Sequence, residues 1–335
     1  MKRLSRKDNM KKLLNKKMIA IFVTIIVLII LPFVLKSLDS GIYYLNVVNY
    51  IFAYAVATIG LNIMTGYTGQ INLGGAAYFS VGAYSVVIFR NMGLPIMVSF
   101  ILGMLIVALF GFLTAVPAAR LKYHFLALAT MAVGDIVNNL LTVSPGGFTN
   151  DTHGMFVKSL SIFNIKLSSD FALYYLLMPI TLLCLLFSWA FVHSRTGRAC
   201  IATRDDVDAS SGCGIDVKKY KIIATVISCV MIGIGGFMFA YVNRYISPDT
   251  FAAGKSAMFM SMVMLGGSGT LLGPILGTVL ITIIMELLRA IPGASVYMQI
   301  AYGLILLLVI MFLPDGITGL INNKINKGKK LDVKD

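Results

Sequence analysis

Glycine and amide side chains interrupt an otherwise apolar part of the chain in the run GYTGQINLGG, residues 66–75. Irregular backbone at membrane depth is tolerated only where protein covers it or where it lines a water-filled path. Broken helices of this kind form binding sites in transporters. We therefore take Gly66, Gly69, Gln70 and Asn72 as candidate residues of a translocation path. A tight turn at the membrane surface explains the same run, and both interpretations stay open at this stage.

Three further polar side chains share one face of another apolar stretch. Asp135, Asn138 and Asn139 are spaced i, i+3 and i+4, so a helix places them side by side. A carboxylate within a membrane costs about 2.5–3.5 kcal/mol on insertion scales, and such groups face the bundle interior or water. Asp135 and Asn138 therefore join the candidate path, although hydrogen bonding between helices explains them equally well.

The longest polar stretch between apolar runs covers residues 194–220. Within it, residues 204–211 suit one short amphipathic helix whose acidic residues come early, where the helix dipole favours them. Gly212 and Gly214 are suited to end that helix in a left-handed turn, and Ile215 then offers an apolar side chain beside the membrane. The stretch is either a docking element for a cytoplasmic partner or a solvated connector.

The sequence contains no complete enzyme motif. The Gly-Lys-Ser run at 254–256 resembles part of a phosphate loop, but that loop needs a glycine where Asp249 stands, and the run is expected to face outward. The three histidines are far apart, and the four cysteines have no ligand spacing. We expect no enzyme, no metal site and no cofactor in this chain.

Long apolar runs must position these polar groups. Residues 18–35 carry no charge and nearly match the run of about 20 apolar residues that crosses a bilayer. Nine more candidate helices follow. The eighth of the ten, 257–266, is too short to cross as a straight helix, so either it begins earlier or it is half of a broken or re-entrant helix. The ten lie near 18–35, 42–64, 75–89, 94–117, 123–141, 171–192, 221–242, 257–266, 271–288 and 296–313.

Composition points to the same class. Hydrophobic residues make up 58% of the chain and charged residues 13%, where soluble domains carry roughly 25% charged residues. The mean hydropathy of +0.86 excludes an ordinary soluble domain. We predict an all-α polytopic membrane protein of about ten transmembrane or re-entrant helices. Five helices followed by five allows an inverted repeat, which rests on that count alone.

Basic residues set the expected orientation. They concentrate before residue 18, near 120, in 194–220 and after 324, and such residues mark the cytoplasmic side. We expect basic cytoplasmic tails at 1–17 and 315–335 around a single transmembrane domain, 18–314, in a plasma membrane. Residues 194–220 should face the cytoplasm and residues 142–170 the exterior.

Taken together, these segments resemble the LivM-type permease subunits of branched-chain amino acid ABC importers in prokaryotes. Three motifs carry the resemblance, which covers roughly residues 49–314. They are GYTGQINLGGAAYFSVGAY at 66–84, RDDVDASSGCGID at 204–216, and YISPDTF with VMLGGSGTLLGPILG at 245–251 and 263–277.

The resemblance implies partners and a role. A second homologous permease, two cytoplasmic ATPases that bind ATP, and an extracytoplasmic substrate-binding protein are expected beside this chain. The ATPase contact carries over onto Arg204, Asp205, Asp206, Ala209, Gly214 and Ile215. The chain departs from the family pattern in two places. Gly75 stands where relatives usually have His, and Ser211 where they usually have Glu.

Two other classes of function remain open from the sequence. A secondary transporter would use Asp135 and Glu286 as proton or ion sites, whereas Glu286 with Arg289 is also suited to a simple ion pair at a helix end. An importer of the same architecture would carry other cargo, such as urea, short amides or nucleosides.

Overall fold

The computed structural model describes residues 26–36, 41–121, 123–144, 146–162, 165–167 and 169–289, with short pieces between 300 and 319. The first predicted helix is therefore described only from residue 26. Most of the tenth, and the two basic tails apart from 316–319, lie outside the described residues.

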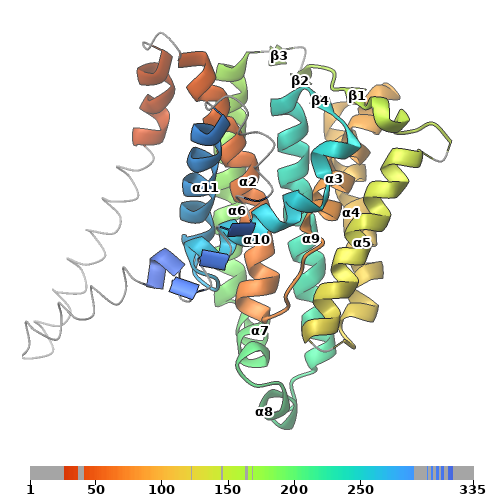
Figure 1. Cartoon of the computed structure of the whole chain (residues 1–335), viewed down its shortest axis with the longest axis vertical. Helices are drawn as coiled ribbons and strands as arrows, with labels where there is room; N and C mark the ends of the chain where they lie inside the picture. The colour runs from red at the N-terminus through yellow and green to blue at the C-terminus, as the bar shows by residue number, and fades with distance from the viewer. Residues whose placement is uncertain are drawn as a thin grey trace, which may run out of the picture.

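Helices dominate the described chain (Figure 1). After a helix at Ile26–Lys36 come α2 (Gly41–Thr68), α3 (Gly75–Asn91), α4 (Ile96–Ala118), α5 (Tyr123–Val143), α6 (Asp170–His193), α7 (Arg195–Asp205), α8 (Val207–Gly212), α9 (Val217–Asn243), α10 (Ala253–Gly266) and α11 (Gly273–Arg289). The strands are β1 (Met155–Phe156), β2 (Leu160–Ile162), β3 (Ile165–Leu167) and β4 (Tyr245–Ile246), and the 3₁₀ turns are η1 (Asp151–His153) and η2 (Pro248–Phe251).

Five of these helices are long and apolar enough to cross a membrane: α2, α4, α6, α9 and the Phe125–Val143 part of α5. The prediction of a helical polytopic membrane protein is thereby confirmed. The short eighth helix is also confirmed, because α10 has only 14 residues and ends where Gly267 adopts a φ of +110°. It lies near the middle of the bundle in Figure 1.

The core lies where α2 and α9 pack against each other, since these two helices are buried over most of their length. Small residues permit the close approach. A Cβ on Gly60 would lie 2.8 Å from the Met231 Cβ, and one on Gly235 would lie 2.7 Å from the carbonyl oxygen of Ala53. Such small-residue contacts drive helix association in lipid, where apolar burial gives little. By contrast, α4, α5 and α6 expose apolar side chains such as Leu105.

The two ends of the bundle differ in character. Figure 1 shows α7 and α8 at one end and the β strands at the other. There β1 pairs antiparallel with β4, and Arg244 forms an ion pair of 2.6 Å with Asp170 at the start of α6. The predicted polar loops at 142–170 and 194–220 therefore lie at opposite ends, as a membrane crossing by α6 requires.

Candidate functional site

The glycine-rich run after α2 breaks the helical structure inside the bundle. The chain leaves the helix at Thr68 and resumes it at Gly75, and Figure 1 shows the segment between them rising from the α7 end toward the middle. Gln70 and Asn72 are each only 2% exposed. Residues 69–74 therefore form a non-helical segment whose amide side chains are buried although Ile71 is exposed, and a tight surface turn does not describe them.

Side chains of this segment hold it in place. The Gln70 amide donates to the carbonyl oxygen of Lys221 at 3.3 Å and accepts from the Thr225 hydroxyl at 3.4 Å. Asn72 accepts from the backbone N–H of Gly74 at 2.6 Å. These bonds satisfy backbone and amide groups that the break in the helix would otherwise leave unpaired. In this conformation the two predicted path residues serve the fold of the segment.

A second contact ties the end of α2 to α7. The Arg204 guanidinium donates from Nη1 to the carbonyl oxygen of Gly66 at 2.8 Å, and it pairs with Asp205 at 3.0 Å. Gly69 has a φ of +71°, and a Cβ there would lie 2.8 Å from the Arg204 Cγ. Glycine at 69 thus lets α7 approach the glycine-rich run closely.

The second glycine-rich run, residues 265–277, meets the same place through Asn62. That side chain accepts from the N–H of Gly269 at 2.8 Å and donates to the carbonyl oxygen of Thr270 at 2.9 Å. We call Asn62, Gly66, Arg204 and Gly269 the junction. Sequence reasoning missed Asn62, although an amide within an apolar run was an available signal.

Gly269, Gly273 and Gly277 repeat every four residues, a spacing that would place them on one helix face, but only the last two lie on α11. Gly269 lies in the turn before α11, with a φ of +75°. Gly273 and Gly277 do share a buried face, where a Cβ on Gly277 would fall 1.8 Å from the carbonyl oxygen of Met262 and one on Gly273 would fall 2.9 Å from that of Gly266. Their role is close packing of α10 against α11, as the spacing predicts for those two.

The polar stretch expected to dock a partner contains two helices, so the predicted single helix over 204–211 is wrong. The chain breaks at Asp206, which is extended and accepts from the N–H groups of Asp208 and Ala209 at 2.9 Å each. This side chain caps the start of α8. The two hydrogen bonds that Asp206 accepts from free N–H groups favour a new helix start over continuation of α7.

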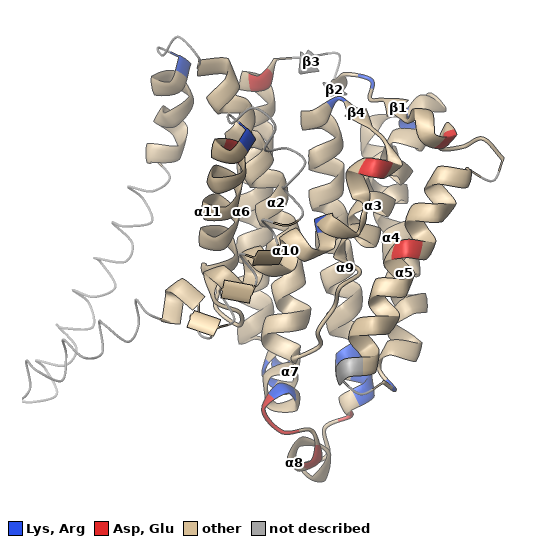
Figure 2. Cartoon of the chain, in the orientation of Figure 1, with Lys and Arg blue, Asp and Glu red and all other residues tan. Residues whose placement is uncertain are grey.

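The end of α8 follows the prediction more closely. Gly214 has a φ of +81°, and the N–H groups of Gly214 and Ile215 return to Ser211 and Ser210 in a Schellman arrangement. Asp205 and Ala209 are exposed and Ile215 is half-buried. Figure 2 shows Lys and Arg gathered around α7 and the adjacent helix ends, while the middle of the bundle carries few charges.

On α5 the polar residues divide between two environments. Asn138 is half-buried and donates to the carbonyl oxygen of Pro248 at 3.3 Å. Asp135 is exposed on the surface of the chain, so of the two expected environments, the bundle interior and water, the interior of this chain is excluded. Thr130 and Val137 occupy the inward face of α5, and Asp135, two residues before Val137, falls on the other side.

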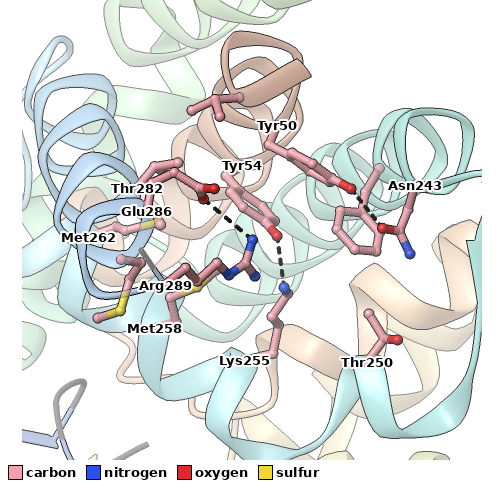
Figure 3. A pocket seen from close by; sticks show the side chains of 13 residues that line it. Tyr50, Tyr54, Asn243, Thr250, Lys255, Met258, Met262, Thr282, Glu286 and Arg289 are labelled. Carbon is pink, nitrogen blue, oxygen red and sulfur yellow. Dashed lines mark hydrogen bonds and ion pairs between the residues drawn. The ribbon is translucent and has the colours of Figure 1, made fainter. Parts of the chain in front are cut away.

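A cavity of about 230 Å³ opens between α2, α9, α10 and α11 (Figure 3). The Lys255 ammonium points into it and donates to the Tyr54 hydroxyl at 2.8 Å. Glu286 and Arg289 line the cavity and form an ion pair of 3.4 Å, which confirms the predicted pairing. Sequence reasoning considered Lys255 only as part of an incomplete phosphate loop, and a lysine immediately before a short apolar run was the overlooked signal.

Comparison with known proteins now adds to this geometry. A family described as "Branched-chain amino acid transport system / permease component" matches residues 43–313. The chain belongs to this permease family. The family's members are transport proteins and not enzymes, so the expectation that the chain is no enzyme is confirmed.

Individual relatives agree with the family assignment. The permease is 29% identical to the high-affinity branched-chain amino acid transport system permease protein LivM of Salmonella typhimurium over 79% of its own length and 67% of that relative. It is 24% identical to LivH of Escherichia coli, over 79% and 91%. It is also 25% identical to the autoinducer 2 import system permease protein LsrC of Yersinia pseudotuberculosis, over 83% and 80%. No solved structure matches the permease.

Proposed function

We propose that this permease is the membrane-spanning subunit of an ABC importer that moves branched-chain amino acids with energy from separate ATPases. The observation that carries the proposal is the junction, where α7 contacts both glycine-rich runs through Arg204 and Asn62. The family match supports a transport role, and the relatives named LivM and LivH support this cargo.

The mechanism starts at α7 and α8 on the cytoplasmic side. Two ATPase subunits bind ATP, close on each other and displace this pair of helices. Asp205 on α7 and Ala209 on α8 have exposed side chains that can contact the ATPases. The Schellman turn at Gly214 and the Asp206 cap keep α8 rigid, so displacement reaches α7 with little loss. No cofactor binds to the permease itself, because ATP belongs to the partner subunits.

Displacement of α7 then moves the interior of the bundle. Arg204 pulls on the carbonyl of Gly66, and Gly66 is continuous with the buried segment 69–74. That segment contacts α5 through the hydrogen bond from the Leu73 N–H to the Thr130 hydroxyl at 3.0 Å. The coupling residues Arg204, Asp205, Asp206, Ala209, Gly214 and Ile215 thus act on the path residues Gly66, Gly69, Gln70, Asn72, Asp135 and Asn138.

A second homologous permease covers the exposed side of α5, where Asp135 and Asn139 lie among apolar side chains. Placing a carboxylate such as Asp135 against lipid costs free energy. A second subunit and a shared water-filled path beside Asp135 would remove that cost. An extracytoplasmic binding protein delivers substrate at the β-strand end. In this arrangement about ten transmembrane or re-entrant helices, with a five-plus-five inverted repeat, place both termini in the cytoplasm of a prokaryotic cell.

Co-expression with its candidate partners tests this proposal. The tagged permease is expected to retain a second permease and two ATPase subunits through purification in detergent. The binding protein loaded with leucine, isoleucine or valine should stimulate ATP hydrolysis by that complex. Urea, short amides and nucleosides should give no stimulation. A permease that purifies without any ATPase, or stimulation by one of these other solutes alone, contradicts the proposal.

A further inference from the structure

The cavity between α2, α9, α10 and α11 carries an unbalanced positive charge. Lys255 and Arg289 are basic and Glu286 is the acidic residue among the described residues that line it. Glu286 already accepts from Arg289 and from the Tyr43 hydroxyl. Within the part of the chain that the structure describes, no carboxylate lies within ion-pair distance of Lys255. The cavity therefore suits a ligand that brings a negative charge.

Aromatic side chains fix the position of the Lys255 ammonium in the cavity. Its ammonium lies 4.7 Å from the centre of the Tyr54 ring and 4.9 Å from that of Phe239, and both rings are buried. Such cation–π contacts fix the position of the charge. An ammonium has three donors, and the Tyr54 hydroxyl is its one hydrogen-bond partner among the described residues. Two donors remain for a ligand.

A second polar group points to a ligand independently. The Thr282 hydroxyl lines the same cavity (Figure 3), and its residue is only 7% exposed. Among the described residues this hydroxyl is one of few buried polar atoms without a hydrogen-bond partner. A buried unpaired hydroxyl is costly, and a bound carboxylate removes that cost by accepting a hydrogen bond from it.

The remaining walls select the rest of the ligand. Met258, Met262 and Met285 line the cavity, and flexible thioether side chains adapt to branched aliphatic groups. A volume of about 230 Å³ is below the range of about 300–1,000 Å³ that holds drug-sized ligands, so the ligand is small. Each Glu286 oxygen accepts one of the two bonds from Tyr43 and Arg289 and keeps a second acceptor site, so the carboxylate can also accept from an ammonium group.

We propose that this cavity is a substrate site in which Lys255 and Thr282 bind the carboxylate of a small aliphatic amino acid. The ammonium group of the substrate faces Glu286, and its side chain lies against the methionines. The proposal rests on the proposed import function and adds the subsite that recognises the charged end of the substrate.

Binding of radiolabelled leucine to the purified complex of both permeases and both ATPases, without binding protein, tests this site. Unlabelled leucine and leucine amide are the competitors, because the amide lacks the carboxylate. We expect leucine to compete at least about tenfold better than its amide, given the strength of hydrogen bonds to charged groups. Lys255→Met should weaken leucine binding about tenfold or more and remove the preference over the amide. Lys255→Arg should keep the preference.

Matched variants separate the site from folding. Lys36→Met removes an exposed lysine outside the cavity and should leave binding unchanged. Thr282→Val should weaken leucine binding about threefold, whereas Thr181→Val, which changes an equally buried threonine on α6, should not. Co-purification of the ATPases with each variant confirms assembly.

Three outcomes overturn the site. In the first, Lys255→Met retains both wild-type affinity and the acid preference. In the second, the wild-type complex binds acid and amide equally, and in the third it binds neither probe. A complex that assembles and hydrolyses ATP but gives one of these outcomes refutes only the site. Failure of the permease to recruit ATPases refutes the proposed import function instead.

Discussion

The Arg204 guanidinium caps the carbonyl oxygen of Gly66 at 2.8 Å, across 138 residues of sequence. Gly66 lies in the last turn of α2, where carbonyl groups lack partners within the helix and where a cation is favoured by the helix dipole. The bond joins the exposed α7–α8 pair to the buried break in the bundle. It is the physical link on which energy transfer in our account depends.

Removal of this link should uncouple ATP hydrolysis from transport. We expect Arg204→Gln to lower ATP-driven leucine uptake by about tenfold, because a hydrogen bond to a charged group contributes about 1.5–3 kcal/mol. Arg198→Gln is the matched control, since Arg198 lies on the same helix and donates to the carbonyl oxygen of His193. Equal uptake by the two variants in proteoliposomes would count against the link.

Two substitutions of Asp206 distinguish its role as a helix cap from a role of its negative charge. Asparagine caps a helix as well as aspartate does, while alanine costs about 1 kcal/mol. We therefore expect Asp206→Asn to retain ATPase stimulation by the binding protein and Asp206→Ala to lose most of it. If the Asn variant fails as badly as the Ala variant, the negative charge itself contacts the ATPase and our assignment of Asp206 as a cap is incomplete.

Gly66 should tolerate no side chain. A Cβ there would lie 2.1 Å from the Asn62 Oδ1 and 2.3 Å from the Gly269 nitrogen, so Gly66→Ala must push the two glycine-rich runs apart. We expect a loss of about 1–3 kcal/mol, the usual cost of overpacking, measured as a lower midpoint in a thermal scan by size-exclusion chromatography. Gly134→Ala, whose Cβ would meet only an ordinary contact at 3.7 Å, should leave the midpoint within error.

Native cysteines report the sidedness of the α7–α8 pair. Cys213 is exposed, whereas Cys184, Cys200 and Cys229 are buried. Maleimides react with thiolates, so an impermeant maleimide at pH 7 should label inside-out vesicles at Cys213 and leave intact cells unlabelled. Cys213→Ser should abolish the signal and Cys200→Ser should not change it.

The pH dependence of that labelling follows from burial. Burial raises the pKa of Cys200 to about 11, so its thiol stays protonated until the pH approaches that value. Between pH 7 and pH 9 Cys200 should therefore stay unmodified, as mass spectrometry of the labelled peptides will show. Modification of Cys200 in this range would mean that α7 is not packed as the structure has it.

Much of the fold is predictable from hydrophobic length and punctuation. The long apolar runs predict helices such as α4 and α6 within a few residues, and a 10-residue run between glycines predicts a short α10. The division of 194–220 at Asp206 is not predictable in this way. The same local sequence is compatible with an aspartate inside one polar helix and with an aspartate that caps a second helix. Only the two N–H groups that it satisfies distinguish them.

The candidate site is less predictable than the fold. Gln70 and Asn72 are recognisable as buried polar residues, yet the sequence does not show that their amides bond to neighbouring backbone. Asp135 differs in another way. Its spacing from Asn138 predicts one helix face but not which face the rest of the chain covers. Lys255 and Thr282 lie on separate elements, so nothing local in the sequence brings them to one cavity.

ATP-dependent uptake of labelled leucine into proteoliposomes tests the central claim most directly. The vesicles contain this permease, a second permease and both ATPases. The binding protein is added outside the vesicles, at the β-strand end of the permease. We predict uptake that requires ATP at the α7–α8 side and that persists when proton and sodium gradients are collapsed. Uptake by the permease alone that is driven by an ion gradient and indifferent to ATP would contradict the account.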